Sequence, residues 1–248
     1  MNHISTKIIC LLSVLFLAFL SHPLLAADSS FEQGIMAYET GDYQRAIETF
    51  EKLSENGVSA ALLYNLANSY AQSDQTGMAI LNYKRASYLK PGDSDIQGNL
   101  ELLRKEKGLF QEEQNLTQRF VGLLGINQWT ILAAGGFVCF AVVLLVPPTL
   151  LRLQTGPRRM WALFCLLLSI SAGLGMYGSY LHYQDGVVVA QDARLQVSPF
   201  ASAASTGTIQ EGRLLTPLKV HSNYVLVKDE TGRSGWLAAE DFIQIATF

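Results

Sequence analysis

Cysteine is scarce in this chain of 248 residues, which has three: Cys10, Cys139 and Cys165. All three lie in long apolar runs, so the polar segments contain no thiol for a disulfide framework or for nucleophilic catalysis. The four histidines are scattered, and no glycine-rich phosphate loop or nucleophile elbow is present. The net charge of −3 gives no basic footprint for nucleic acid. We therefore expect no enzyme activity, no catalytic residue, no metal or other cofactor, and no nucleic-acid partner.

Charge is absent from two long stretches. No Asp, Glu, Lys or Arg occurs between Arg119 and Arg152, or between Arg159 and Asp185. Because about 20 apolar residues are enough to cross a bilayer, we predict transmembrane helices at 129–151 and 160–183. The basic turn at 152–159 joins them. Two buried helices of this length without a polar face would need more protein around them than this chain provides.

Small residues occur in both predicted spans, where they would allow close packing of the two helices. They are Gly135, Gly136, Gly173, Gly175 and Gly178. An alternative is that Ser171, Gly175 and Ser179, spaced every fourth residue, recruit another membrane protein. No ionisable Asp, Glu, Lys or Arg lies inside either span, which makes a transporter or channel a poor interpretation.

Residues 1–27 have the pattern of a secretory signal peptide. Lys7 precedes an apolar core, and Ala26 and Ala27 provide a small-residue cleavage region. An uncleaved anchor is the alternative. An exported leader places the following segment outside, and a turn with Arg152, Arg158 and Arg159 favours the cytoplasm. Both soluble segments are then expected on the same, outer side of the membrane.

Residues 28–107 contain an internal repeat. The second unit, with Leu63, Leu66, Ala67, Tyr70, Ala79, Tyr83, Ala86 and Pro91, resembles a tetratricopeptide repeat. Equivalent places 33 residues earlier are occupied by Gly34, Ala46, Phe50 and Leu53. This resemblance implies an all-α solenoid of two repeats and a closing helix after Pro91.

A peptide-binding groove is the function that this solenoid would offer. Its candidate residues are Tyr64, Asn65, Asn68 and Gln72 on one helical face, with Ile35 and Glu39 from the first repeat. Amides at this spacing are able to hold an extended peptide backbone. The alternative is that these are ordinary solvated polar residues.

The segment at 108–128 joins this region to the first span. Leu116, Phe120 and Leu124 recur at helical spacing, which predicts an amphipathic helix at the membrane interface with Trp129 at headgroup level. The alternative is that the segment continues the solenoid and packs against its last helix.

Residues 186–248 change to short β-rich runs separated by turns. Residues Arg194, Pro199, Gly212, Tyr224, Val227, Gly232, Gly235 and Trp236 resemble a bacterial Src-homology-3 (SH3) domain, which implies a small all-β barrel of about five strands. Tyr224, Trp236 and Phe242 are candidates for an apolar groove that binds peptide or cell-wall material. The alternative is that these aromatic residues form the core of the barrel.

The order of segments describes a multi-domain membrane protein: an all-α solenoid, a two-helix transmembrane hairpin and an SH3-like barrel. This order resembles the BatE family of bacterial aerotolerance operons. The resemblance implies an inner-membrane location with both soluble parts in the periplasm. It also implies membrane-anchored von Willebrand factor A (Bat) proteins as partners and, indirectly, a MoxR-type ATPase, in an envelope or oxidative-stress complex.

Two functions remain open at this stage. The first is a non-catalytic scaffold in membrane lipid, whose soluble parts act together on a shared target. The second is a module that binds peptidoglycan through its last domain and recruits a wall enzyme through its first.

Overall fold

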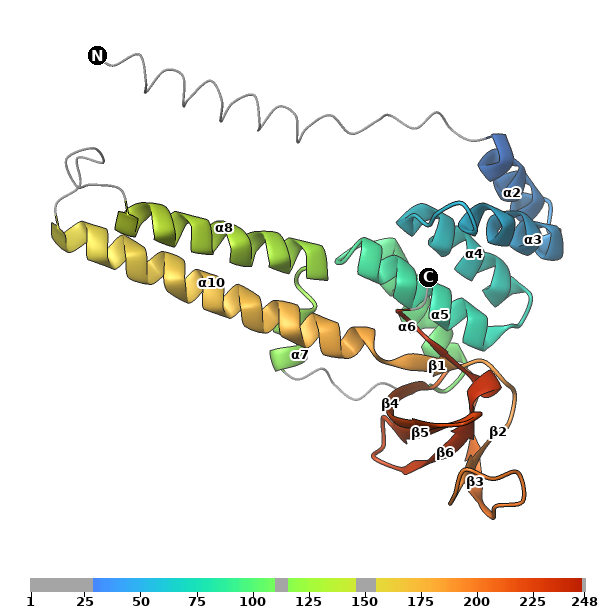
Figure 1. The fold of residues 1–248 in the computed structure, drawn as a ribbon. Helices are drawn as coiled ribbons and strands as arrows, with labels where there is room; N and C mark the ends of the chain where they lie inside the picture. The colour runs from blue at the N-terminus through green and yellow to red at the C-terminus, as the bar shows by residue number, and fades with distance from the viewer. Residues whose placement is uncertain (1–28, 110–115, 146–154, 247–248) are drawn as a thin grey trace.

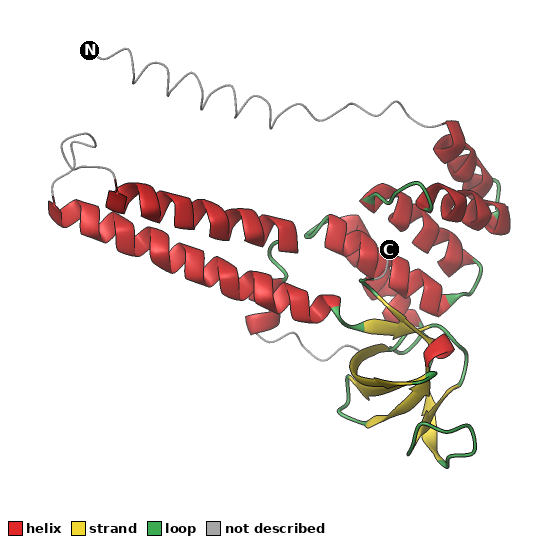
Figure 2. Cartoon of the chain, in the orientation of Figure 1, coloured by secondary structure: helices red, strands yellow, loops and turns green. Residues whose placement is uncertain are grey.

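The computed structural model describes residues 29–109, 116–145 and 155–246. The predicted signal peptide and residues 152–154 of the basic turn lie outside these ranges. The described residues form a layer of short helices with a sheet beneath it, and we call these two parts together the head. Two long helices lie side by side and project from one end of the head (Figure 1, Figure 2).

The helical layer begins the described chain. Its elements are α2 (Ser29–Glu39), α3 (Tyr43–Ser54), α4 (Ala60–Gln72), α5 (Thr76–Leu89) and α6 (Ser94–Glu106). Three of these helices are capped by their own sequence: Asp42 accepts from the amide of Arg45, Ser59 from that of Leu62, and Asp93 from those of Asp95 and Ile96. Helices α4 and α5 pack closely because Ala67 and Ala79 are small and fully buried at the crossing.

The sheet follows α10 in the chain. It is built from β1 (Gly186–Val188), β2 (Ala193–Gln196), β3 (Ser205–Ile209), β4 (Leu214–His221), β5 (Tyr224–Asp229), β6 (Ser234–Ala238) and β7 (Phe242–Gln244), with a 3₁₀ turn at Ala239–Asp241 before β7. Its order is β3-β2-β6-β5-β4-β1-β7, and all of its pairs are antiparallel. Side chains alternate along β5, so that Val225 and Val227 are buried while Leu226 is not.

The helical layer and the sheet share one hydrophobic core. Val187 of β1 and Ile245, just after β7, belong to the same buried cluster as Phe50, Leu81 and Leu103 of the helices. Arg85 of α5 strengthens this contact, because its guanidinium donates to the carbonyl oxygens of Gln244 and Ile245 at 3.2 and 3.1 Å.

Helix α5 lies at the centre of this arrangement. Its N-cap residue, Gln75, makes no side-chain capping bond. Instead, Glu211 in the turn before β4 accepts from the amide of Gly77 at 2.6 Å, which places a carboxylate at the positive end of the helix. The same turn brings Gly212, with φ +83°, so close to α5 that a Cβ there would lie 2.6 Å from Ile80 Cδ1.

The predicted fold class is therefore wrong. The helices close against a seven-stranded sheet instead of forming a free all-α solenoid, and the sheet has more strands than the small separate barrel that was expected. The physical reason is the burial of α5, where Thr76, Gly77, Ala79 to Tyr83, and Ala86 are all buried. A repeat helix at the end of a solenoid would expose one of these faces.

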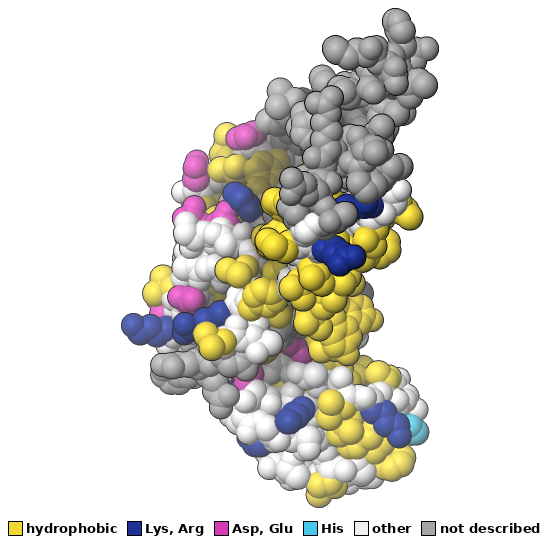
Figure 3. All heavy atoms as spheres, turned by 90° about the vertical axis from the view of Figure 1, so that its left-hand side faces the viewer, with side chains coloured by type: hydrophobic (Ala, Val, Ile, Leu, Met, Phe, Trp, Pro, Cys, Tyr) yellow, Lys and Arg dark blue, Asp and Glu magenta, His cyan; other side chains and the backbone are white. Residues whose placement is uncertain are grey.

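Within the residues that the structure describes, two helices are long and apolar enough to cross a membrane. They are α8 (Ile126–Leu145) and the stretch Arg158–Leu181 of α10 (Thr155–Tyr183). Only 11% of the most apolar stretch of the first helix, and 17% of that of the second, is buried within the molecule. A core helix of a soluble protein would be mostly buried. Viewed from the hairpin side, hydrophobic side chains gather over these helices (Figure 3).

Two of the glycines lie at the contact between the long helices, where Gly136 faces Ser169 and Gly175 faces Trp129. A Cβ at Gly136 would lie 3.2 Å from Ser169, and a Cβ at Gly175 would lie 2.6 Å from the Trp129 ring. Gly135 and Gly173 have nothing within 4 Å of such a Cβ. The short helix α7 (Leu116–Val121) precedes α8.

The side chain of Trp129 on α8 packs against Gly175 of α10 and against Phe120 of α7. It is only 3% exposed, and its indole Nε1 donates to the carbonyl oxygen of Val121 at 3.1 Å. At the opposite end of the hairpin, the Arg158 guanidinium donates to the carbonyl oxygens of Val143 and Leu144, both at 2.7 Å. These carbonyls end α8, so Arg158 caps one limb of the hairpin from the other.

Candidate functional site

A line of tyrosine and asparagine side chains crosses the helical layer. We call it the Tyr–Asn strip, and it consists of Tyr64, Asn68, Tyr83 and Asn99. Asn99 Nδ2 donates to Tyr64 Oη at 3.0 Å and to Asn68 Oδ1 at 3.1 Å, and the rings of Tyr64 and Tyr83 are 6.1 Å apart. The strip thus connects α4, α5 and α6 through polar contacts.

Burial raises the pKa of the Tyr83 hydroxyl well above its ordinary value. This hydroxyl is therefore protonated at neutral pH and donates to Asn68 Oδ1. Tyr64, Asn68 and Asn99 each keep part of their surface exposed, so a peptide chain has access to amide and phenol groups along the strip.

The structure brings together some of the predicted groove residues. Tyr64 and Asn68 belong to the Tyr–Asn strip, whereas the side-chain amide of Asn65 donates to the carbonyl oxygen of Ala61 in its own helix at 2.9 Å. Gln72 is exposed at the end of α4.

The first-repeat candidates lie on α2. Ile35 packs against the helical core, and Glu39 is exposed at the end of that helix. Asn99 and Tyr83 were not among the predicted site residues. Asn99 directly precedes the buried Leu100 and lies one turn after the buried Ile96, so its helical spacing already placed it near the packed face.

The three predicted groove residues of the sheet do not share a face. Trp236 is partly buried next to His221, with the two rings 6.2 Å apart, and Tyr224 pairs with His221 across the β4–β5 hairpin. Phe242 is 8% exposed in the core of the sheet, and a Cβ at Gly186 would lie 2.4 Å from its ring. The sheet therefore offers Tyr224 and Trp236, but not Phe242, to an outside ligand.

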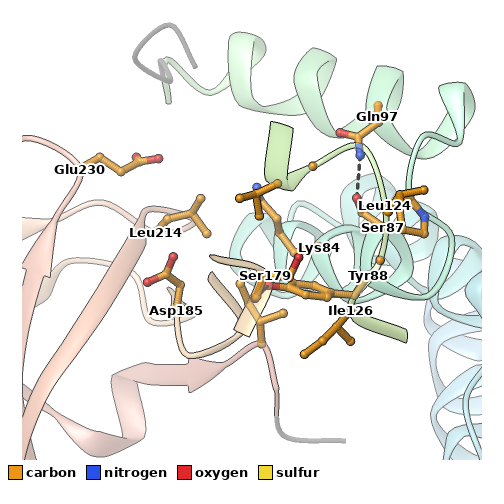
Figure 4. Close-up of a pocket in the computed structure, with 15 residues that line it drawn as sticks. Lys84, Ser87, Tyr88, Gln97, Leu124, Ile126, Ser179, Asp185, Leu214 and Glu230 are labelled. Carbon is orange, nitrogen blue, oxygen red and sulfur yellow. Dashed lines mark hydrogen bonds between the residues drawn. The ribbon is translucent and has the colours of Figure 1, made fainter. Parts of the chain in front are cut away.

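A cavity of about 280 Å³ lies where the head meets the hairpin. It is lined by Lys84, Ser87 and Tyr88 of α5, Pro91, Gln97 of α6, Val121, Gly122, Leu124, Gly125, Ile126, Ser179 of α10, Asp185, Leu214, Glu230 and Ile245. Figure 4 shows Asp185 and Glu230 on the sheet side, Leu124 and Ile126 on the other side, and Lys84 between them.

The charges around this cavity are unusual because they are only partly paired. Glu230 Oε1 accepts from Arg104 Nη2 at 2.8 Å, but within the described ranges Glu230 Oε2 and Arg104 Nη1 are buried without a hydrogen-bond partner. Burial, followed by the positive charge of Arg104, lowers the pKa of Lys84 to about 8, against the opposing effect of Glu230 and Asp185. Perturbed groups in a cavity are typical of functional sites.

Among the residues that the structure describes, no group of three or more His, Cys, Asp or Glu side chains is placed to hold a metal ion. Comparison of the chain with known proteins finds no matching protein family, curated protein or solved structure.

Proposed function

We propose that this chain is a non-catalytic docking protein of a bacterial inner membrane. Its two apolar helices cross the bilayer, and its head of helices and strands lies on the periplasmic side. The apolar and mostly exposed surfaces of α8 and α10 support the membrane anchor. Arg158 and Arg159, at the end of the hairpin away from the head, favour a cytoplasmic turn.

The observation that carries this proposal is the shared core of the head. Val187 and Ile245 of the sheet region are buried among the helices of the first segment, and this shared core supports our proposal that the two parts lie on the same side of a membrane. A hairpin with two spans allows this arrangement. The head then behaves as one body that presents the Tyr–Asn strip and the Trp236 face at the membrane surface.

We infer that the Tyr–Asn strip receives an extended segment of a partner protein. The polar atoms of the strip are able to bond a peptide backbone, and the acidic side chains of α2 and α3 would attract a segment with basic character. From the segment order, which resembles that of the BatE family, we propose membrane-anchored von Willebrand factor A proteins as these partners, with a MoxR-type ATPase acting through them.

The test is site-specific photocrosslinking of the full chain in native membranes. A photoreactive phenylalanine derivative replaces Tyr64 in the strip, and the matched control carries it at Met36, which is 64% exposed on α2. We expect a von Willebrand factor A protein to be crosslinked from position 64 and not from position 36. Equal crosslinking from both positions, or none from position 64, contradicts the proposal.

A second function, binding of peptidoglycan, is favoured by the partly exposed Trp236 beside His221 and by Phe200, which is 59% exposed. Because the sheet shares its core with the helices, the full chain and not a fragment is used for the test. Sedimentation of the detergent-solubilised chain with isolated peptidoglycan, and its loss in Trp236→Ala, would support this function over the first.

A further inference from the structure

The cavity between the head and the hairpin changes in polarity from one side to the other. Val121, Leu124 and Ile126 line it where α7 ends and α8 begins, at the foot of the hairpin. Lys84, Asp185 and Glu230 line it toward the helical layer and the sheet (Figure 4). A ligand that fits this lining has a charged end within the head and an apolar end that faces the membrane helices.

The charged side of the cavity has unused bonding capacity. Glu230 Oε2 is buried without a hydrogen-bond partner among the described residues. The other carboxylate oxygen, Glu230 Oε1, pairs with Arg104, which is 3% exposed. No hydrogen bond or ion pair to Lys84 Nζ is found in the described part of the chain. Buried polar atoms without partners are unfavourable, and a bound polar group removes this cost.

The signs of the charges restrict the ligand. A simple anion near Lys84 would also meet the carboxylates of Asp185 and Glu230, and a simple cation near these carboxylates would meet Lys84. A group that carries both charges avoids either conflict. A primary ammonium has the N–H donors that carboxylate oxygens accept, and a phosphate accepts from the ammonium of lysine.

We propose that this cavity binds a phosphoethanolamine group, with its ammonium facing Glu230 and Asp185 and its phosphate facing Lys84. The volume of about 280 Å³ suits a group of this size, since pockets for larger, drug-sized ligands begin at about 300 Å³. The apolar lining from Val121, Leu124 and Ile126 is continuous with the two long apolar helices. The ligand chemistry therefore fits the headgroup of phosphatidylethanolamine.

The weak basicity of Lys84 is consistent with this site. Burial lowers its pKa to about 8, and a phosphate at contact distance would restore its preference for the charged form. The site does not depend on the protein partner proposed above, because it lies between the head and the hairpin and not on the Tyr–Asn strip.

The experiment uses the full chain, purified in detergent. Short-chain phosphatidylethanolamine, phosphatidylglycerol with the same acyl chains, and free phosphoethanolamine are titrated while thermal unfolding is followed, and native mass spectrometry detects bound lipid. We expect saturable stabilisation by phosphatidylethanolamine and none by phosphatidylglycerol, which lacks the ammonium. Stabilisation by free phosphoethanolamine at equal concentration would identify the soluble zwitterion as the source of the same group.

Two variants and one control make the result specific. Lys84→Met and Glu230→Gln should each weaken phosphatidylethanolamine binding by about tenfold or more, because each removes a charged partner. Lys90→Met removes an ammonium that pairs with Asp93 at the surface, and should bind like the natural chain. Equal binding of phosphatidylglycerol, undiminished binding in both cavity variants, or no binding of either ethanolamine compound overturns the proposal.

Discussion

The hydroxyl of Tyr88 on α5 donates a hydrogen bond to the carbonyl oxygen of Ser179 on α10, at 3.2 Å. This bond joins the helical layer to the membrane-length helix at the foot of the hairpin. A second contact lies beside it, where a Cβ at Gly125 would be 2.9 Å from the ring of Pro91. The helical layer therefore contacts both α10 and the segment that leads into α8.

Tyr88→Phe tests this attachment. The substitution keeps the ring and removes the bond to Ser179, so we expect the free energy of unfolding to fall by about 1 kcal/mol. Denaturant unfolding of the full chain in detergent measures this change. Tyr177→Phe, at a position 60% exposed on α10, is the control and should change the stability by less than about 0.5 kcal/mol. Identical stability of the two variants would show that the bond does not hold the head in place.

Glu211→Ala tests the contact between the sheet region and helix α5. Glu211 is the carboxylate that accepts from the Gly77 amide, and α5 has no side-chain cap of its own. Loss of this cap should lower the free energy of unfolding by about 1–2 kcal/mol. Glu101→Ala on the exposed face of α6 serves as the control, and hydrogen exchange of the first amides of α5 reports the local effect. An unchanged exchange rate there contradicts the capping role.

The two long apolar helices were predictable from sequence because a long absence of charge has few structural explanations. The packing of the helical layer against the sheet was not predictable in this way. Glu211 and Gly77 are 134 positions apart, and no periodicity relates them. Each segment resembled a known repeat or barrel when taken alone, since local spacing reports which face of an element is buried but not what covers it.

For the candidate sites too, local spacing identified residues on one element but not residues that tertiary packing separates. Tyr64 and Asn68 were identified because both lie on one helix, where their spacing fixes their common face. Phe242 was grouped with Trp236 because both are aromatic residues near the end of the chain. Strand β7 pairs with β1 and not with β6, so Phe242 enters the core, and only the sheet order separates the two residues.

The packing of the hairpin predicts a difference between two neighbouring glycines. A Cβ at Gly175 would lie 2.6 Å from the Trp129 ring, whereas a Cβ at Gly173 would meet nothing within 4 Å. Gly175→Ala should therefore destabilise the hairpin by about 1–3 kcal/mol through overpacking. Gly173→Ala should have little effect or stabilise it slightly. The measurement is thermal unfolding in detergent, together with the intrinsic tryptophan fluorescence, to which Trp129 contributes. Equal effects of the two substitutions would show that α8 and α10 do not pack as the structure has them.

Lys84→Met separates the stability of the cavity from its role. The ammonium of Lys84 is desolvated and close to the positive charge of Arg104, and both lower its pKa to about 8. A methionine of similar length has no charge to desolvate, so we expect the variant to unfold at a temperature about 3 °C or more above that of the natural chain at pH 7, in the absence of lipid. A gain in stability with a loss of lipid response is the result expected of a residue kept for binding.

The pH dependence of this difference checks its cause. The folded pKa of Lys84 is about 8 and the ordinary value is 10.5, so between these values the unfolded chain binds more protons than the folded chain. The free energy of unfolding of the natural chain should therefore rise with pH in this window. Lys84→Met lacks this contribution, so its advantage should be largest below pH 8 and should shrink toward pH 10.5. Unfolding curves of both chains from pH 7 to 10.5 measure the difference, and a constant advantage across this window would rule out the charge of Lys84 as its origin.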